Sequence, residues 1–242
     1  MSCRTNSYNL PIFHKLSTKP PNYYHSSIST LNCRAHSISS HEPHITATQT
    51  SSHPTNLFNI KFQTLEDCKL GIGSYPDFEY DANGGIGSAT GKFNGFNPTE
   101  EIFALFDLEK LYIPPLTGAT TRFLGLPLPP FLKIDIAPEI FQGSINRASG
   151  KVELQFRAKF WFSIGIIYRA PPLMVETILT SEESKGSLRS GKGERLDKEG
   201  KCRLVGVATV DPIDDVIMNS FLGLPTECIA ELSAQIFITT AG

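Results

Sequence analysis

The chain has 242 residues, with 22 Lys and Arg against 24 Asp and Glu, and a formal net charge of −2 at pH 7. Four of the basic residues and none of the acidic ones lie in residues 1–34, so the remainder carries 18 minus 24, or −6. Such an acidic balance argues against nucleic acid and anionic lipid as partners, and no apolar run approaches the ~20 residues of a transmembrane helix.

Residues 1–34 have the composition of an organelle transit peptide, since they are rich in Ser, Thr and Asn and lack acids. Sparse arginine and a Cys33-Arg34-Ala35 junction that resembles a stromal processing site favour the chloroplast over the mitochondrion. The alternative is an untargeted polar tail. Residues 35–56 predict a disordered leader. We therefore expect a chloroplast protein, in the stroma or associated with the thylakoid, with one β-rich domain at residues 57–242.

All six histidines lie between positions 14 and 53, so the expected domain contains none. This excludes, within that domain, histidine general bases, catalytic triads that use histidine and histidine-containing metal sites. Its three cysteines, Cys68, Cys202 and Cys228, are widely spaced, which indicates reduced structural thiols, with a regulatory Cys202–Cys228 disulfide as the alternative. We expect no metal site and no cofactor.

The first elements in chain order are two strands at residues 77–80 and 86–93. The Asn83-Gly84 pair between them predicts a tight hairpin. This glycine-rich stretch also resembles a phosphate-binding loop. However, Ile86 stands where a Walker A motif requires glycine, and Thr90 stands where a dinucleotide motif requires it, so both nucleotide motifs fail.

Asn97-Pro98-Thr99-Glu100 is typical of a helix start, with Asn97 as the N-cap. The apolar spacing that follows predicts a helix from Pro98 to about Tyr112, packed against a sheet. Residues 123–131 are then interrupted by three prolines and predict a loop with large apolar side chains. This loop is either a buried crossover, a lid over a ligand cavity or a membrane contact.

Short strands are expected at residues 132–136 and 140–145, followed by the clearest strand signal of the chain, Lys151 to Ile166. Its even positions are apolar from Val152 onward, and its odd positions are polar up to Lys159. Because side chains alternate between the faces of a strand, one face is apolar and the other charged. We expect this strand to bend near Ser163 or Gly165.

The remaining elements are strands at residues 173–180, 202–210 and 227–239, with exposed hairpin ends at 182–201. Asp211-Pro212 predicts a second short helix that ends at Gly223. Phe-Leu-Gly-Leu-Pro occurs twice, at residues 123–127 and 221–225, which indicates either a weak internal duplication or coincidence.

These elements predict a mainly β protein, in which a twisted antiparallel sheet closes into a barrel-like single domain with two short helices. A sheet with helices against one face is the alternative. The leading hypothesis is a non-catalytic protein that binds a hydrophobic small molecule, namely a lipid, pigment or prenyl compound, or a thylakoid-associated partner. The expected ligand-binding residues are Phe123, Leu126, Phe131, Phe160, Trp161 and Phe162.

Two other functions stay open. The first is an isomerase or cyclase that acts on an apolar substrate without histidine, which requires a charged or tyrosine side chain inside the cavity. Its candidates for proton transfer are Glu153, Arg157, Tyr168, Arg169 and Glu176. The second is an assembly or scaffold factor for a thylakoid complex, which requires a filled interior and an exposed apolar patch.

Overall fold

A computed structural model describes residues 57–93 and 101–241, which belong to one compact unit. The expected transit peptide, the expected leader and the predicted helix start at residues 97–100 lie outside the described residues. Fifteen strands and one short helix are found within them. None of the helical structure in this part of the chain is long and apolar enough to span a membrane.

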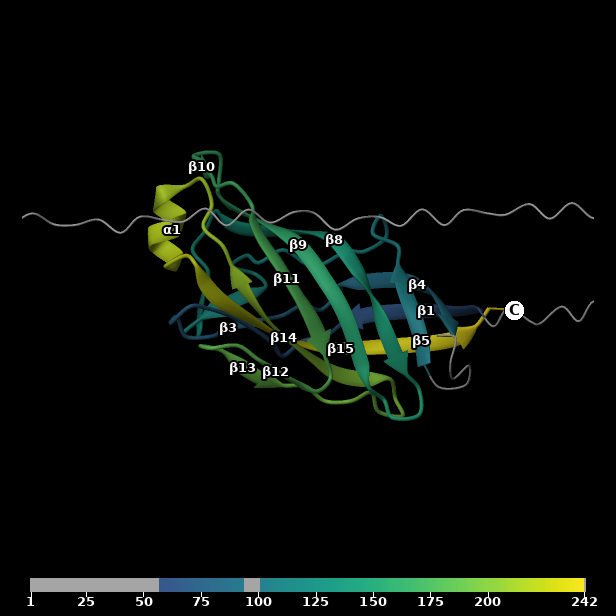
Figure 1. Cartoon of the computed structure of the whole chain (residues 1–242). Coiled ribbons are helices and arrows are strands. Elements are labelled where there is room, and N and C mark those ends of the chain that lie inside the picture. The colour runs from purple at the N-terminus through teal and green to yellow at the C-terminus, as the bar shows by residue number, and fades with distance from the viewer. Residues whose placement is uncertain (1–56, 94–100, 242) are drawn as a thin grey trace, which may run out of the picture. The chain divides into compact units, whose positions relative to one another are not determined.

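Eight strands pair antiparallel to form a closed ring, because the last strand, β15, returns to pair with β1 (Figure 1). The expected barrel-like antiparallel sheet is therefore confirmed. Around the ring the strands are β1 (Leu57–Thr64), β4 (Ile86–Phe93), β5 (Glu101–Phe106), β8 (Leu132–Asn146), β9 (Val152–Ile164), β11 (Leu173–Thr180), β14 (Lys201–Val210) and β15 (Thr226–Thr240).

The ring is not a regular barrel, because one edge of β15 is shared by two partners. Residues 234–240 of β15 pair with β1, and residues 228–231 pair with β2 (Cys68–Ile72). From β2 the sheet continues through β3 (Phe78–Tyr80) and β6 (Thr121–Phe123) to β7 (Leu126–Pro127). We call the half of the ring beside β2, β3, β6 and β7 the open end. The other half, where β1, β4 and β5 complete the wall, we call the closed end.

Three minor strands and the helix complete the fold. β10 (Tyr168–Arg169) pairs with the end of β9, and β12 (Glu183–Lys185) forms a separate hairpin with β13 (Ser190–Lys192). That hairpin lies on the outer face of β14 and β15. The helix α1 (Val216–Leu222) precedes β15, and Figure 1 shows it beside β10, away from the C-terminus.

Strand β8 is one continuous element rather than the two short strands predicted. Pro138, which cannot donate a backbone hydrogen bond, lies at a bulge between Pro138 and Ile140. The extra residue changes which positions face inward. Before the bulge the even positions Leu132, Ile134 and Ile136 face the interior, and after it Phe141 and Ile145 do. The bulge therefore keeps apolar side chains inside along the whole strand.

The predicted helix from Pro98 to Tyr112 is wrong for its described part, because residues 101–106 form β5. Ile102, Ala104 and Phe106 are buried, whereas Phe103 and Leu105 point outward and are exposed. The six residues fit a helical repeat as well as an alternating one, and pairing with β4 and β8 selects the strand. The described residues thus contain one helix instead of two.

The predicted hairpin around Asn83-Gly84 is also wrong. β3 pairs with β2 and β6, whereas β4 pairs with β1 and β5, so the two strands do not pair with each other. β1 and β2 follow each other in the same direction, and β3 and β4 run antiparallel beside β2 and β1 respectively. The chain therefore continues from β3 into β4 without reversing. The turn at residues 82–85, in which the Gly85 N–H donates to the Ala82 carbonyl at 3.1 Å, is a local irregularity between these two strands.

One further expectation needs correction: helix α1 begins later than predicted, because its N-cap is Asp215 rather than Asp211. The expected reduced thiols are confirmed, because Cys68, Cys202 and Cys228 are all free, and the alternative Cys202–Cys228 disulfide does not form. Cys202 lies opposite Ala234, whereas Cys228 lies opposite Ala208, so the two cysteines sit at different ends of the β14–β15 pair.

The closed end holds the main hydrophobic core. Phe58, Ile60 and Phe62 of β1 pack there against Ile102 and Phe106 of β5. The intervening strand β4 has the small inward residues Gly87, Ala89 and Gly91 before Phe93, and a Cβ added at Gly91 would lie 2.6 Å from Ile102 and 2.9 Å from Ile60. These small residues let large side chains from both neighbouring strands meet, so the closed end is filled.

Candidate functional site

The open end encloses an apolar cavity of about 520 Å³, which is within the size range of small-molecule sites. Its walls are the inward positions of the long strands together with β2, β3, β6 and β7. The long strands contribute Leu132, Ile134, Ile136, Phe141, Phe156, Phe160, Phe162, Leu173, Val175, Thr177, Leu179, Ala208, Val210, Cys228, Ala230 and Leu232.

Aromatic rings form the floor of the cavity, where it meets the closed end. Phe62, Phe141 and Phe156 line the cavity, and Phe106 supports them from the core. The ring centroids of Phe106 and Phe141 are 4.2 Å apart, and those of Phe62 and Phe141 are 5.3 Å apart. The floor is therefore a packed aromatic cluster that separates the cavity from the core.

One side wall is completed by the segment between β5 and β6, which crosses the gap between β3 and β8. Leu116 forms an isolated bridge with Ile134 of β8, and the Tyr80 hydroxyl donates a hydrogen bond to the Pro114 carbonyl. Leu116 and Leu128 are buried against Tyr80. The predicted loop at residues 123–131 belongs to this wall and contains the turn of the β6–β7 hairpin and strand β7.

Helix α1 covers part of the cavity mouth. It begins where Asp215 Oδ1 accepts the Met218 N–H at 2.9 Å, and it ends at Gly223, whose φ of 68° is left-handed. Met218 is 2% exposed and packs beneath the helix, while Phe221 and Leu222 line the cavity. The helix is thus held by its apolar face against the mouth.

A polar contact fixes the helix to β10. The Tyr168 hydroxyl donates a hydrogen bond of 2.6 Å to Asp215 Oδ2. This bond, together with the Met218 N–H, lowers the pKa of Asp215, whereas burial and the same bond raise the pKa of Tyr168 to about 12. The carboxylate is consequently stabilised in its ionised form, in which it caps the helix.

The cavity presents almost entirely carbon and hydrogen to its contents. No Asp, Glu, Lys or Arg is found among the described residues that line it. The hydroxyl groups of Thr64 and Thr177 donate to backbone carbonyls at 2.6 and 2.8 Å, and those of Tyr75 and Tyr80 donate to carbonyls as well. Burial also raises the pKa of the Cys228 thiol to about 11, so it is neutral at pH 7.

The six residues predicted to bind a ligand do not all lie in the cavity. Phe123, Leu126, Phe160 and Phe162 line it. Trp161 lies on the outer face of β9, where the Arg169 guanidinium lies 4.7 Å from its ring centroid. Phe131 is 80% exposed beside the mouth. Trp161 was predicted to bind a ligand because the odd-numbered face of the alternating stretch becomes apolar after Lys159, but this face is the outer face of the ring.

Sequence reasoning missed the floor and the β14 and β15 walls. Alternation in residues 202–210 and 227–239 puts Ala208, Ala230 and Leu232 on the inward face, so the pattern contained that information. Alternation in residues 57–64 likewise puts Phe62 on the inward face. The contact of Phe62 with Phe141 follows from no such pattern, because it joins residues that are 79 positions apart (141 − 62).

The residues considered for proton transfer lie outside the cavity. Glu153 pairs with Lys151, and Arg157 pairs with Glu139, both on the outer face of the sheet. Glu176 accepts a hydrogen bond from Gln155 at 3.2 Å. Arg169 and Tyr168 are engaged by Trp161 and Asp215 respectively. The structure therefore brings none of these five side chains to the cavity wall.

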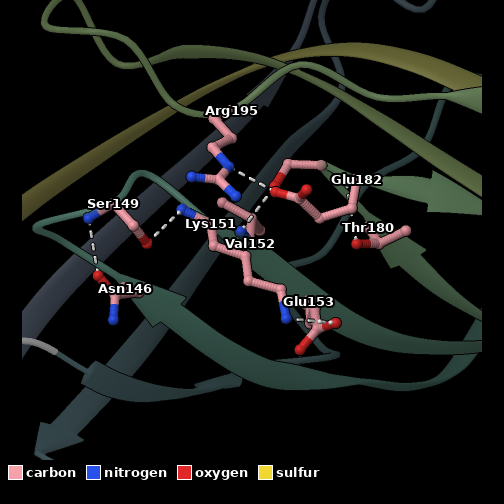
Figure 2. Close-up of polar contacts among 9 residues, drawn as sticks. Asn146, Ser149, Lys151, Val152, Glu153, Thr180, Glu182 and Arg195 are labelled. Carbon is pink, nitrogen blue, oxygen red and sulfur yellow. Dashed lines mark hydrogen bonds and ion pairs between the residues drawn. The ribbon is translucent and has the colours of Figure 1, made fainter.

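A second, more open hollow beside β12 and β13 is polar and is stabilised by its own contacts. Arg195 Nε is 2.5 Å from Glu182 Oε1, and this contact lowers the pKa of Glu182. Figure 2 shows Arg195 directed toward Glu182, with Lys151 turned away toward Glu153. Nothing in this arrangement requires a ligand. Groups of three or more residues able to hold a metal ion are absent from the described part of the chain.

The two Phe-Leu-Gly-Leu-Pro segments have different conformations. In the first, Leu124 and Gly125 form the β6–β7 turn with positive φ angles of 53° and 77°. In the second, Phe221 and Leu222 end α1. The segments are therefore not copies of one structural unit, although both contribute side chains to the cavity.

Together, the ring and its interior define a structural class, an antiparallel β-ring that encloses an apolar cavity at one end. A scan against protein-family models and searches of curated proteins and of solved structures give no significant match to this chain.

Proposed function

We propose that the protein binds an uncharged, apolar small molecule in the cavity at the open end and acts as a carrier or binding protein rather than a catalyst. The observation that carries this proposal is a cavity of about 520 Å³ without a charged side chain among its described lining residues. Its ligand classes are neutral lipids, pigments and prenyl compounds. The transit-peptide composition of residues 1–34 supports a site of action in the chloroplast.

Electrostatics favour a neutral ligand over a fatty acid. An ionised carboxylate in a low-dielectric site needs a partner of opposite charge, and the described lining provides no Lys or Arg. An acyl ester or an isoprenoid has no such requirement. We therefore expect the polar end of the ligand to lie at the mouth, where Leu126 and Phe221 are both exposed and part of the lining.

The two other functions have weaker support. A histidine-independent isomerase or cyclase needs a proton donor or acceptor at the substrate, and its five candidates lie outside the cavity. A scaffold with a filled interior does not account for the cavity. We therefore propose ligand binding alone.

The test is fluorescence titration of the full-length protein with a pyrene-labelled fatty acid and its methyl ester. We expect the ester to bind and the free acid to bind about tenfold more weakly at neutral pH, a ratio that corresponds to about 1.4 kcal/mol. A preference for the acid would contradict the neutral-ligand proposal. Absence of binding by either probe would count against ligand binding itself.

Two neighbouring residues of β14 provide a matched pair of variants. Ala208 faces the cavity, whereas Thr209 is exposed on the outer face. Ala208→Phe places a ring in the cavity and should weaken ester binding at least about tenfold, while Thr209→Phe should leave it unchanged. Equal effects of the two variants would argue that the probe binds elsewhere.

A further inference from the structure

The mouth of the cavity is surrounded by exposed apolar side chains from four segments. Among the described large hydrophobic residues more than 60% exposed, all lie there except Leu188. We call the residues at the mouth, without Leu188 and with the addition of Phe221 at 54% exposure, the apolar rim. Its members are Leu124 and Leu126 of the β6–β7 hairpin, Phe131 before β8, Ile166 and Ile167 of the β9–β10 turn, and Val216, Ile217 and Phe221 of α1.

Contacts join these segments around the mouth. Phe123 stacks on Phe78 of β3 at 4.7 Å, and Tyr75 after β2 donates a hydrogen bond of 2.5 Å to the Phe221 carbonyl. The Tyr168–Asp215 bond joins α1 to β10. The circuit closes where the Gly165 N–H donates to the Phe131 carbonyl at 2.8 Å, just after β7. The rim is thus one structural feature.

The rim is continuous with the cavity, because Leu126 and Phe221 belong to both. Exposed apolar side chains on several separate tips are poorly suited to water and suit a surface that adapts to their shape. Ile166 and Ile167, at 105% and 89% exposure, form the most prominent tip. The acyl chains of a bilayer cover such tips without requiring a matching shape.

Charge near the rim selects the kind of bilayer. The cations near the other rim segments lie beside partners. Arg122 of β6 is opposite Glu79 of β3, Lys133 of β8 is 2.7 Å from Asp135, and Arg169 is stacked on Trp161. Next to α1, by contrast, lie three acidic residues, Asp211, Asp214 and Asp215. Acidic side chains at this position repel an anionic surface. A bilayer of uncharged or zwitterionic lipids has no such conflict.

We propose that the apolar rim docks on the surface of a lipid bilayer without net charge, so that the ligand passes between the bilayer and the cavity without crossing water. This inference rests on the proposed function. It assigns the source of the ligand, a membrane, and it assigns the surface that contacts this membrane.

Flotation of the full-length protein with phosphatidylcholine vesicles tests the inference. We expect the protein to float with the vesicles, and we expect flotation to be insensitive to salt. A variant that carries both Ile166→Asp and Ile167→Asp should lower the vesicle partition coefficient at least about tenfold, because each substitution replaces an inserted apolar side chain with a charge. Both positions are exposed, so the variant should fold.

The matched control is Ile178→Asp. Ile178 is 57% exposed on β11, among residues that form the outer face of the ring. This substitution should leave flotation unchanged. The double variant should also bind the pyrene ester in solution within about twofold of the natural chain, since its substitutions lie outside the cavity.

The outcomes separate the two proposals. A protein that binds the ester but does not float overturns membrane docking and leaves ligand binding standing. A protein that floats but binds no ester in solution overturns the transfer of ligand and the proposed function. Equal losses for Ile178→Asp and the double variant overturn the rim as the contact surface. A dimer that the double variant converts to a monomer, without vesicle binding, assigns the rim to a second copy and overturns the inference.

Discussion

On β15, Ala234 is fully buried in the core of the closed end, whereas Ala230, four residues earlier on the same face, lines the cavity. The two positions share a strand, an orientation and a side chain. They differ in the partner of β15, which is β1 beside Ala234 and β2 beside Ala230. What surrounds the strand, rather than its own pattern, therefore decides whether its inward face packs or encloses space.

The change of partner has a geometric consequence. At the closed end, β4 alone separates β1 from β5, and its small inward residues bring these neighbours together. At the open end, β2, β3, β6 and the crossing segment at Leu116 occupy the corresponding part of the wall. More chain surrounds the interior there, and the inward side chains do not fill it.

The largest expected effect compares a phenylalanine at each end. Phe106→Ala removes a ring that contacts Phe62 and Phe141 in the core and should lower the free energy of unfolding by about 4 kcal/mol. Phe160→Ala enlarges a space that already exists and should cost about 1–2 kcal/mol. Urea denaturation of both variants measures the difference. Similar losses would mean that the open end is packed as well.

Replacing an alanine with phenylalanine at each end should also distinguish the closed end from the open end. Ala234→Phe forces a ring into a filled core and should destabilise the protein by about 3 kcal/mol. Ala230→Phe directs the ring into the cavity and should change stability by less than about 1 kcal/mol while it weakens ester binding. The same denaturation experiment checks both values. A strongly destabilised Ala230→Phe variant would contradict the presence of the cavity.

The smallest effect concerns how α1 is held. Tyr168→Phe removes the largest cause of the lowered pKa of Asp215, so this pKa should rise toward its ordinary value of 3.8. The pKa of Asp215 in the folded protein lies below 3.8. The ionised cap therefore stabilises the protein at pH values above 3.8, and this contribution is lost as the pH falls through the lowered pKa. NMR titration of the side-chain carboxyl carbons measures the shift.

That titration contains its own control. Lys110 lowers the pKa of Asp107, which lies after β5 and far along the chain from α1, so its value should not change in the Tyr168→Phe variant. In the same variant, hydrogen exchange at the Met218 amide should become faster, since the capping carboxylate is less firmly positioned. An unchanged Asp215 pKa would mean that the tyrosine does not fix the helix.

Local patterns predicted the long strands well. The alternation from Val152 to Ile164 and from Glu227 to Thr239 identified β9 and β15 because each strand has one face inside the ring. The same rule failed for residues 101–106, where a helical spacing was also present. It failed again at Pro138, because an interrupted pattern indicates two strands as readily as one strand with a bulge.

The cavity was predictable in part. The apolar inward face and the proline-rich loop with Phe123 and Leu126 indicated where a site could lie. The volume of the cavity was not predictable, since it depends on β15 exchanging one partner for another and on contacts such as that between Phe62 and Phe141. Such pairings join distant parts of the chain and are fixed by tertiary packing rather than by any local spacing.

The hydroxyl groups of Thr64, Tyr75, Tyr80 and Thr177, which line the cavity, already donate to backbone carbonyls, and this limits what the proposed site can distinguish. A site that forms few directional bonds rejects charge but cannot read the uncharged functional groups of the proposed ligand, and among neutral ligands it discriminates by fit, at about 1–3 kcal/mol for each methylene added or lost. Selection should therefore follow the length and thickness of the molecule, with tolerance for oxidation state and double-bond position. Association should carry a negative heat-capacity change, because it removes apolar surface from water.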